Sequence, residues 1–136
     1  MIKMITGPIS LLLLAVTTAQ AQAGVVVIGH AGLGKLKTAT IQRIYTGKII
    51  EIDGISITPV NIHPGQLHDQ FLHDFLNLDS DKYAAYWTVR RYIGKGVPPM
   101  VLNTAEEVKH FVQSTPGAIG YIDESQANEQ LNVIAR

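Results

Sequence analysis

Apolar residues from position 24 onward recur with the spacings of strands and helices in turn. Residues 25–28 are a continuous β-branched run, which predicts a strand buried on both faces. Ile41, Ile44 and Tyr45 then share one side of a predicted helix over residues 37–45, which Gly47 ends. The first elements are therefore a buried strand and an amphipathic helix.

A hairpin and two helices follow. Asp53-Gly54 lies between the apolar runs 49–52 and 55–58, which is typical of a two-residue hairpin, and the second strand continues to residue 62. Apolar residues then recur at helical spacing over 67–78. Asp79 or Ser80 caps the next helix, and one side of that helix carries Tyr83, Tyr86, Trp87, Arg90 and Ile93. We expect the aromatic residues Tyr83, Tyr86, Trp87 and Tyr92 to be core and not a ligand-stacking platform or a partner surface.

The C-terminal third predicts a short strand over 100–102, a helix, and strands over 118–122 and 131–134. Thr104 with Glu107 has the spacing of a capping box at the start of that helix. The alternation of strands and helices predicts an α/β fold, with helices packed on a mostly parallel sheet.

The first 23 residues have the pattern of an export signal and not that of a helix or strand of the domain. Lys3, the apolar run 9–16 and the small residues of 19–23 predict a cleavable signal peptide, cut after Ala21 or after Ala23. The run is much shorter than the ~20 residues that span a bilayer. We therefore expect a signal peptide over 1–23 and one periplasmic domain over 24–136, without membrane contact after cleavage.

Composition excludes some classes of function. The chain has no cysteine, so no disulfide framework is available. Eleven basic and eleven acidic residues balance, and removing Lys3 leaves a net charge near −1. This balance gives no electrostatic footprint for nucleic acid.

Residues 29–35 nearly match a phosphate-binding loop, because Gly29 follows a strand and Gly34-Lys35 precedes a helix. The next residue is Leu36, where the motif needs a hydroxyl to hold Mg²⁺. A glycine-rich turn that joins strand to helix is the better interpretation.

Three histidines, His63, His68 and His73, are spaced five residues apart. On a regular helix this spacing points His68 and His73 about 140° apart, which does not suit a shared metal ion. We interpret them as solvated polar positions, with His63 the better candidate for an anion contact. No catalytic constellation has support in the sequence, so we expect neither enzymatic activity nor a cofactor or metal.

Several segments together resemble one family. They are Ile44-Tyr45-Thr46-Gly47-Lys48, Asp53-Gly54 before Ile57-Thr58-Pro59-Val60-Asn61, Tyr86-Trp87, Gly94-Lys95-Gly96-Val97-Pro98-Pro99, Glu106-Glu107-Val108 and Thr115-Pro116-Gly117-Ala118-Ile119-Gly120-Tyr121-Ile122. The chain resembles small stand-alone relatives of the phosphate-type periplasmic substrate-binding proteins of ABC transporters. The resemblance implies a single type II periplasmic-binding-protein lobe, matching the second lobe of the complete proteins.

The resemblance also implies where a ligand would bind. The family's S-G-T turn, which holds part of the oxyanion, matches Gly65, Gln66 and Leu67, so both hydroxyl donors are replaced, and an upstream arginine is absent. His63 and His68 adjoin this turn, and His30 and Lys95 are further candidate contacts. The helix N-terminus itself remains and attracts anions.

We therefore expect a non-enzymatic periplasmic binding module for phosphate or another small oxyanion. The alternative is an envelope interaction or accessory protein that keeps the lobe, has lost phosphate binding, and contacts an envelope partner or a second copy. An envelope enzyme is a third, weaker interpretation.

Overall fold

The computed structural model describes the chain except for residues 1–3, 5–6, 9 and 17–23. Lys3 and the predicted cleavage sites after Ala21 and Ala23 lie outside the described residues, so the signal peptide stays a prediction. Residues 10–16 form neither helix nor strand. Within the described part of the chain, no helix has the length and apolar character needed to cross a bilayer.

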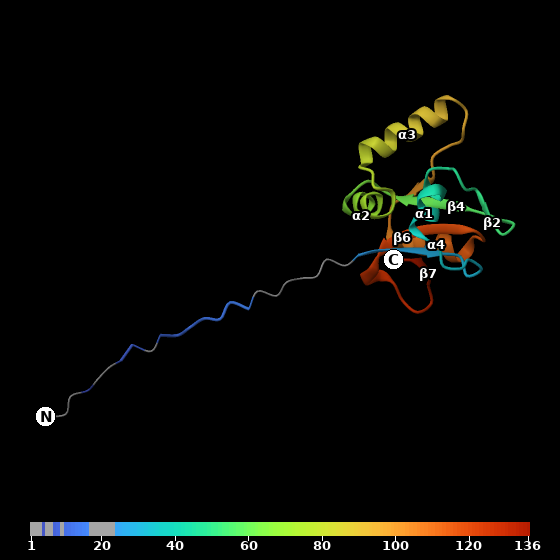
Figure 1. Cartoon of the computed structure of the whole chain (residues 1–136). Helices are drawn as coiled ribbons and strands as arrows, with labels where there is room; N and C mark the ends of the chain where they lie inside the picture. Colours follow the sequence, from blue (N-terminus) through green and yellow to red (C-terminus); the bar gives the residue numbers. More distant parts are fainter. Residues whose placement is uncertain (1–3, 5–6, 9, 17–23) are drawn as a thin grey trace.

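A five-stranded sheet lies at the centre of the domain, in the order β5-β4-β6-β1-β7 (Figure 1). Four strands run in the same direction, and only β1 runs against its neighbours β6 and β7. The predicted mixed, mostly parallel sheet is therefore confirmed. The strands are β1 (Val25–Gly29), β4 (Thr58–Ile62), β5 (Met100–Leu102), β6 (Ala118–Asp123) and β7 (Asn132–Ala135).

Helices cover both faces of this sheet, as β1 shows most directly. Its Val25 and Val27 belong to one hydrophobic cluster, and Val26 and Ile28 belong to another, because alternate strand residues point to opposite faces. The first cluster contains residues of α1 (Thr38–Tyr45), α2 (Gln66–Phe71) with its π-helical continuation η1 (Leu72–Leu76), and α3 (Ser80–Tyr92). The second contains residues of α4 (Ala105–Ser114). A short 3₁₀ turn, η2 (Glu124–Gln126), precedes β7.

The predicted hairpin forms a small sheet of its own, with strands β2 (Glu51–Ile52) and β3 (Ile55–Ser56). Asp53 and Gly54 both have left-handed backbones, at φ 50° and 81°, as the tightest hairpin turns require. Gly117, at φ 76°, lies against the base of this hairpin, where a Cβ would collide with the Ser56 carbonyl oxygen. The hairpin therefore rests on the turn that leads into β6.

Two predicted helix starts are confirmed by their hydrogen bonds. The Asp79 carboxylate accepts from the Lys82 N–H at 2.8 Å, so Asp79 and not Ser80 is the cap of α3. The Thr104 hydroxyl accepts from the Glu107 N–H at 3.2 Å at the start of α4. One expectation is wrong: Ile93 does not join the buried side of α3, because the helix ends at Tyr92 and Ile93 is 55% exposed.

Gly117→Ala is expected to destabilise the domain by about 2–5 kcal/mol, because it combines a left-handed backbone with a backbone collision. Gly54→Ala is the matched control, since Gly54 has a similar φ and open space around it. It should cost only about 1–2 kcal/mol. Urea unfolding of both variants measures the difference, and equal losses would contradict the packing of the hairpin on Gly117.

Candidate functional site

The turn between β4 and α2 is the part of the structure where the predicted ligand-binding turn leads into a helix without a side-chain cap. β4 ends at Ile62, residues 63–65 are exposed, and α2 begins at Gln66. No side chain of the described residues caps this helix. The first-turn N–H groups of Gln66, Leu67 and His68 therefore carry the partial positive charge of a helix N-terminus without an acceptor among the described residues.

β4 and β6 place a buried hydrogen-bond network directly behind this turn. The Ile62 N–H donates to the Tyr121 hydroxyl at 3.1 Å, and that hydroxyl donates to the Asn61 side-chain oxygen at 3.1 Å. The Asn61 amide in turn donates to the Tyr83 hydroxyl at 3.2 Å. Asn61 is only 3% exposed, so its polar atoms need these partners. The network ties the end of β4 to β6 and α3.

His68 belongs to the same network. Its Nδ1 lies 2.7 Å from the Tyr121 hydroxyl. Tyr121 has one proton, which Asn61 accepts, so the hydrogen-bond pattern assigns the Nδ1 proton to His68 and leaves Nε2 as an acceptor. Burial lowers the pKa of His68 below its ordinary value of 6.5, against a smaller raising effect of Asp69. The imidazole at the start of α2 is therefore neutral at pH 7.

α3 is held over α1 by three donors on its aromatic side chains. The Tyr83 hydroxyl and the Trp87 indole N–H donate to the Tyr45 carbonyl oxygen at 2.9 and 3.2 Å, and the Tyr86 hydroxyl donates to the Thr46 carbonyl oxygen at 2.7 Å. These carbonyls lie at the C-terminal end of α1, where a helix leaves acceptors without partners. Tyr83 and Trp87 are thus core, as the sequence predicts, and Tyr86 packs partly buried against that core. The expectation is wrong for Tyr92, which is 91% exposed at the last residue of α3. The three hydrogen-bonded aromatic side chains also act as a cap. Burial raises the pKa of Tyr83, so its hydroxyl keeps its proton.

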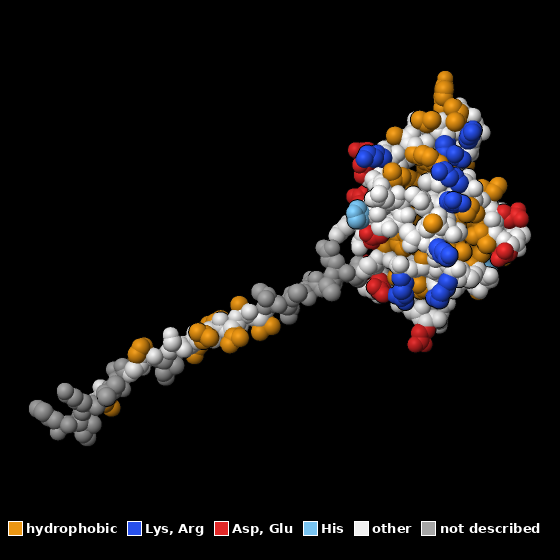
Figure 2. All heavy atoms as spheres, in the orientation of Figure 1, with side chains coloured by type: hydrophobic (Ala, Val, Ile, Leu, Met, Phe, Trp, Pro, Cys, Tyr) orange, Lys and Arg blue, Asp and Glu red, His pale blue; other side chains and the backbone are white. Residues whose placement is uncertain are grey.

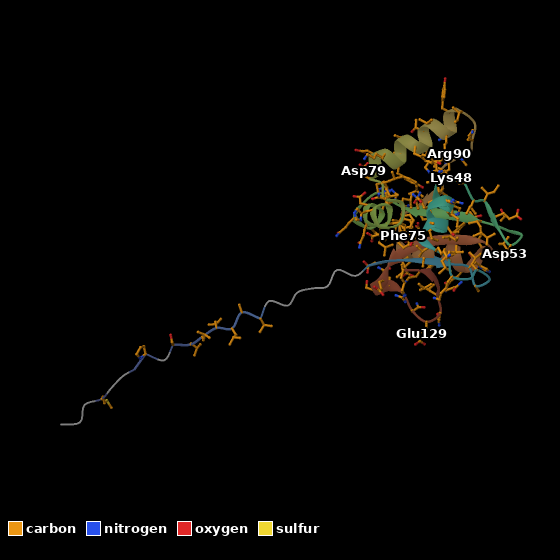
Figure 3. The ribbon with its side chains drawn as sticks, in the orientation of Figure 1. Lys48, Asp53, Phe75, Asp79, Arg90 and Glu129 are labelled. Carbon is orange, nitrogen blue, oxygen red and sulfur yellow. The ribbon has the colours of Figure 1, made fainter. Side chains whose placement is uncertain are left out.

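Lysine and arginine side chains collect along the face shown in Figure 2. The Arg90 guanidinium lies 5.5 Å from the ring centre of Tyr86 and 5.7 Å from that of Trp87. Figure 3 shows Arg90 reaching from α3 toward the segment after α1 that carries Lys48. The described salt bridges include neither residue. This face therefore has a local positive charge, although the basic and acidic residues of the whole chain balance.

A cavity of about 300 Å³ opens beside the α2 turn, beneath α3. The ends of β4 and β5, the first turn of α2 and the segment before β5 form its walls together with α3. Its lining residues are Asn61, Ile62, Pro64, His68, Tyr83, Ala84, Trp87, Thr88, Arg91, Pro98, Pro99 and Val101. The backbone donors of the turn are the candidate site for an anion, and this cavity adjoins them without including residues 65–67.

The structure brings together most of the predicted contact residues. His63, Gly65, Gln66, Leu67 and His68 form one connected turn and helix start. The interpretation of His68 as a solvated position is wrong, because the side chain is buried at 8% exposure. His73 is exposed and pairs with Asp74, as a solvated position would.

His30 and Lys95 lie away from this turn. The His30 N–H donates to the Ala118 carbonyl, and Ala118 pairs with Thr58, so His30 lies where β4 begins and not where it ends. Lys95 lies beyond the end of α3, where its carbonyl accepts from Arg90 at 3.3 Å. Neither lines the cavity beside the turn.

The glycine-rich loop of residues 29–35 does not make a phosphate cradle. α1 begins only at Thr38, after an N-cap at Lys37. The Asn132 amide donates to the carbonyls of His30 and Leu33 at 3.0 and 2.7 Å, so the loop is fastened to β7 through its carbonyl groups. Among the described residues, no three histidine or acidic side chains gather as a metal ion would need.

Sequence reasoning missed Tyr121 and Arg91 as parts of the site. Asn61 is the sequence feature that could have indicated this network, because an amide between the apolar residues Val60 and Ile62 of a strand needs buried hydrogen-bond partners. Tyr121 lies 60 residues away in the chain from that amide, and no local pattern joins the two.

Comparison with solved structures shows the fold. A protein from Clostridium perfringens, assigned as a phosphate ABC transporter substrate-binding protein and solved with bound phosphate, superposes with a TM-score of 0.65 at 21% identity, over 84% of this chain and 45% of that one. PstS from Borrelia burgdorferi superposes with a TM-score of 0.64 at 17% identity, over 85% of this chain and 47% of that one. An ABC-type phosphate transport receptor from Vibrio cholerae superposes with a TM-score of 0.57 at 15% identity, over 84% of this chain and 46% of that one.

The chain thus spans about half the length of these structures and has the fold of one lobe of such proteins. The resemblance to phosphate-type substrate-binding proteins is confirmed at the level of fold. No family model and no curated protein matches the chain.

The buried His68 makes stability depend on pH in a defined direction. Its pKa is lowered in the folded state, so the unfolded chain binds the extra proton first as the pH falls below 6.5. His68→Asn, which keeps a donor near Nδ1, is expected to reduce the loss of stability between pH 7.5 and pH 5. His73→Asn is the control, because His73 is exposed. Urea unfolding at both pH values checks this, and an unchanged pH dependence in His68→Asn would contradict the burial of a neutral imidazole.

Proposed function

We propose that the chain is a non-enzymatic periplasmic binding module, related to the phosphate-binding proteins of ABC transporters, that takes a small oxyanion at the first turn of α2. The observation that carries the proposal is the uncapped start of α2, where Gln66, Leu67 and His68 present backbone N–H groups at the carboxyl end of β4. Open α/β sheets bind ligands at this edge, and helix N-termini bind anions.

The surroundings of the turn favour an anion over a cation. Arg91 lies in the adjoining cavity, and within the described part of the chain no aspartate or glutamate lines that cavity. Asp69 is the acidic residue of the first turn of α2, and its side chain is exposed. The fold neighbours supply independent support, because one of them was solved with bound phosphate.

The expected affinity is low. In the match to the family's motif, Gly65, Gln66 and Leu67 replace two hydroxyl donors, and each hydrogen bond to a charged group is worth about 1.5–3 kcal/mol. In a complete binding protein a second lobe closes over the ligand, and the described residues form one lobe. We therefore expect a dissociation constant on the order of 1 mM for phosphate.

An interaction role is the second candidate, and one observation favours it. Large apolar side chains are exposed around the end of α3 and the segment that follows, namely Val89, Tyr92, Ile93, Val97, Met100 and Val101. Arg91 and Lys95 adjoin them, so a second copy docking on the same patch would bring like charges together. The patch fits a partner protein with an apolar and acidic face.

Calorimetric titration of residues 24–136 with phosphate and with sulfate tests the leading proposal. Gln66→Glu places a carboxylate at the first turn of α2, which the helix dipole tolerates but a bound anion does not. It is expected to weaken anion binding about tenfold by repulsion of ~1–2 kcal/mol. Gln113→Glu, an exposed change on α4, should leave the affinity unchanged.

Equal affinities in the two variants would place the anion elsewhere. No heat with either anion up to several millimolar would overturn the binding proposal and leave the interaction role as the remaining candidate.

A further inference from the structure

The cavity beneath α3 is much larger than an inorganic oxyanion needs. Its volume of about 300 Å³ equals roughly ten times the ~30 Å³ share of one water molecule. This is the lower end of the range for pockets that hold small organic molecules. Pro64 and His68 connect the cavity to the α2 turn, but the three residues between them, 65–67, do not line it. The cavity is therefore a neighbouring site, separate from the backbone donors of the turn.

Most of the cavity wall is apolar. Ile62, Trp87 and Val101 line it together with the rigid pair Pro98-Pro99. The aromatic face of Trp87 is held in place because its indole N–H donates to the Tyr45 carbonyl. A flat or compact apolar group would find a fixed, preformed surface here.

Most polar groups in the wall already have partners inside the protein. The Asn61 amide donates to Tyr83, and the Tyr83 hydroxyl donates to the Tyr45 carbonyl. The Thr88 hydroxyl donates to the Ala84 carbonyl at 2.9 Å. These groups therefore do not require hydrogen bonds from a ligand, and the greater part of the cavity suits an apolar body.

The charge in the wall has one sign. Arg91 lines the cavity from α3, and the described salt bridges do not include it. Its guanidinium matches the geometry of a carboxylate or phosphate group, which it binds with two parallel hydrogen bonds. Among the residues that the structure describes, no acidic side chain lines the cavity to compete for it.

We propose that this cavity binds a small organic anion, with a compact apolar body against Trp87 and Pro98-Pro99 and its carboxylate or phosphate group at Arg91. The inference goes beyond the proposed function, because it requires no binding of free oxyanions at the α2 turn. It assigns the chain a second type of ligand, defined by one anionic group and one apolar group in the same molecule.

Trp87 is the only tryptophan in the chain, so its fluorescence reports directly on the cavity. The experiment titrates residues 24–136 with phenyl phosphate and with benzoate, which carry the two kinds of anionic group. Inorganic phosphate and benzyl alcohol are the controls, since each supplies only half of the ligand. We expect a saturable change in Trp87 emission with at least one aromatic anion, at a dissociation constant at least tenfold below that of either control.

Two pairs of variants locate the site. Ala84→Leu fills the cavity from α3, whereas Ala85→Leu makes the same change at the neighbouring exposed position outside it. Ala84→Leu is expected to weaken binding of the aromatic anion at least tenfold, and Ala85→Leu less than twofold. Arg91→Gln should reduce the affinity of the anion to that of benzyl alcohol, while Lys95→Gln should not. Melting temperatures of all four variants confirm that each is folded.

Three results would overturn the inference. The first is a response that does not saturate with either aromatic anion. The second is equal affinity of Ala84→Leu and Ala85→Leu for the aromatic anion that binds more tightly. The third is a control ligand that binds as tightly as that anion. If one of these results were seen together with inorganic phosphate binding that is lost in Gln66→Glu but retained in Ala84→Leu, the inference would fail while the proposed function would stand.

Discussion

The carbonyl oxygen of Tyr45, at the last residue of α1, is the acceptor on which the arrangement of the helices depends. It is buried at the C-terminal end of a helix, and no backbone N–H of the described residues donates to it, so its donors come from another element. Tyr83 and Trp87 of α3 supply both of them. α3 is thus fixed over α1 by a polar requirement as well as by apolar packing, and its position defines the roof of the cavity.

The same requirement extends from α1 to the ligand-binding edge of the sheet. Tyr83 accepts from Asn61 of β4, Asn61 accepts from Tyr121 of β6, and Tyr121 contacts His68 at the start of α2. All four hydrogen-bonded side chains are buried. Removing one of them leaves its neighbour without a partner, which lowers the free energy of unfolding by about 1–3 kcal/mol. The α2 turn is therefore held on a rigid base although its own residues 63–66 are exposed. A site that is fixed before its ligand arrives loses less free energy on binding.

Local patterns predicted the elements well because the relevant physics is local. Asp53-Gly54 specifies its own turn, and Thr104 caps its own helix. Burial of His68 was missed because the partner, Tyr121, lies 53 residues away in the chain, and a helical-wheel angle says nothing about what packs against it. The direction of β1 against the other strands is likewise a matter of long-range pairing that no spacing reveals. The resemblance to a binding-protein lobe predicted the fold; its assignment of the α2 turn as the ligand site stays a prediction, and it did not indicate the cavity beneath α3.

The central claim is that the first turn of α2, supported by this buried network, binds an oxyanion. Amide chemical shifts of residues 24–136, measured by NMR while phosphate is added at constant pH and ionic strength, test it most directly. We expect saturable shifts of the Gln66, Leu67 and His68 amides, with small changes at the hairpin of β2 and β3. Shifts that do not saturate, or that centre on residues 29–35 and leave the α2 turn unchanged, would contradict it.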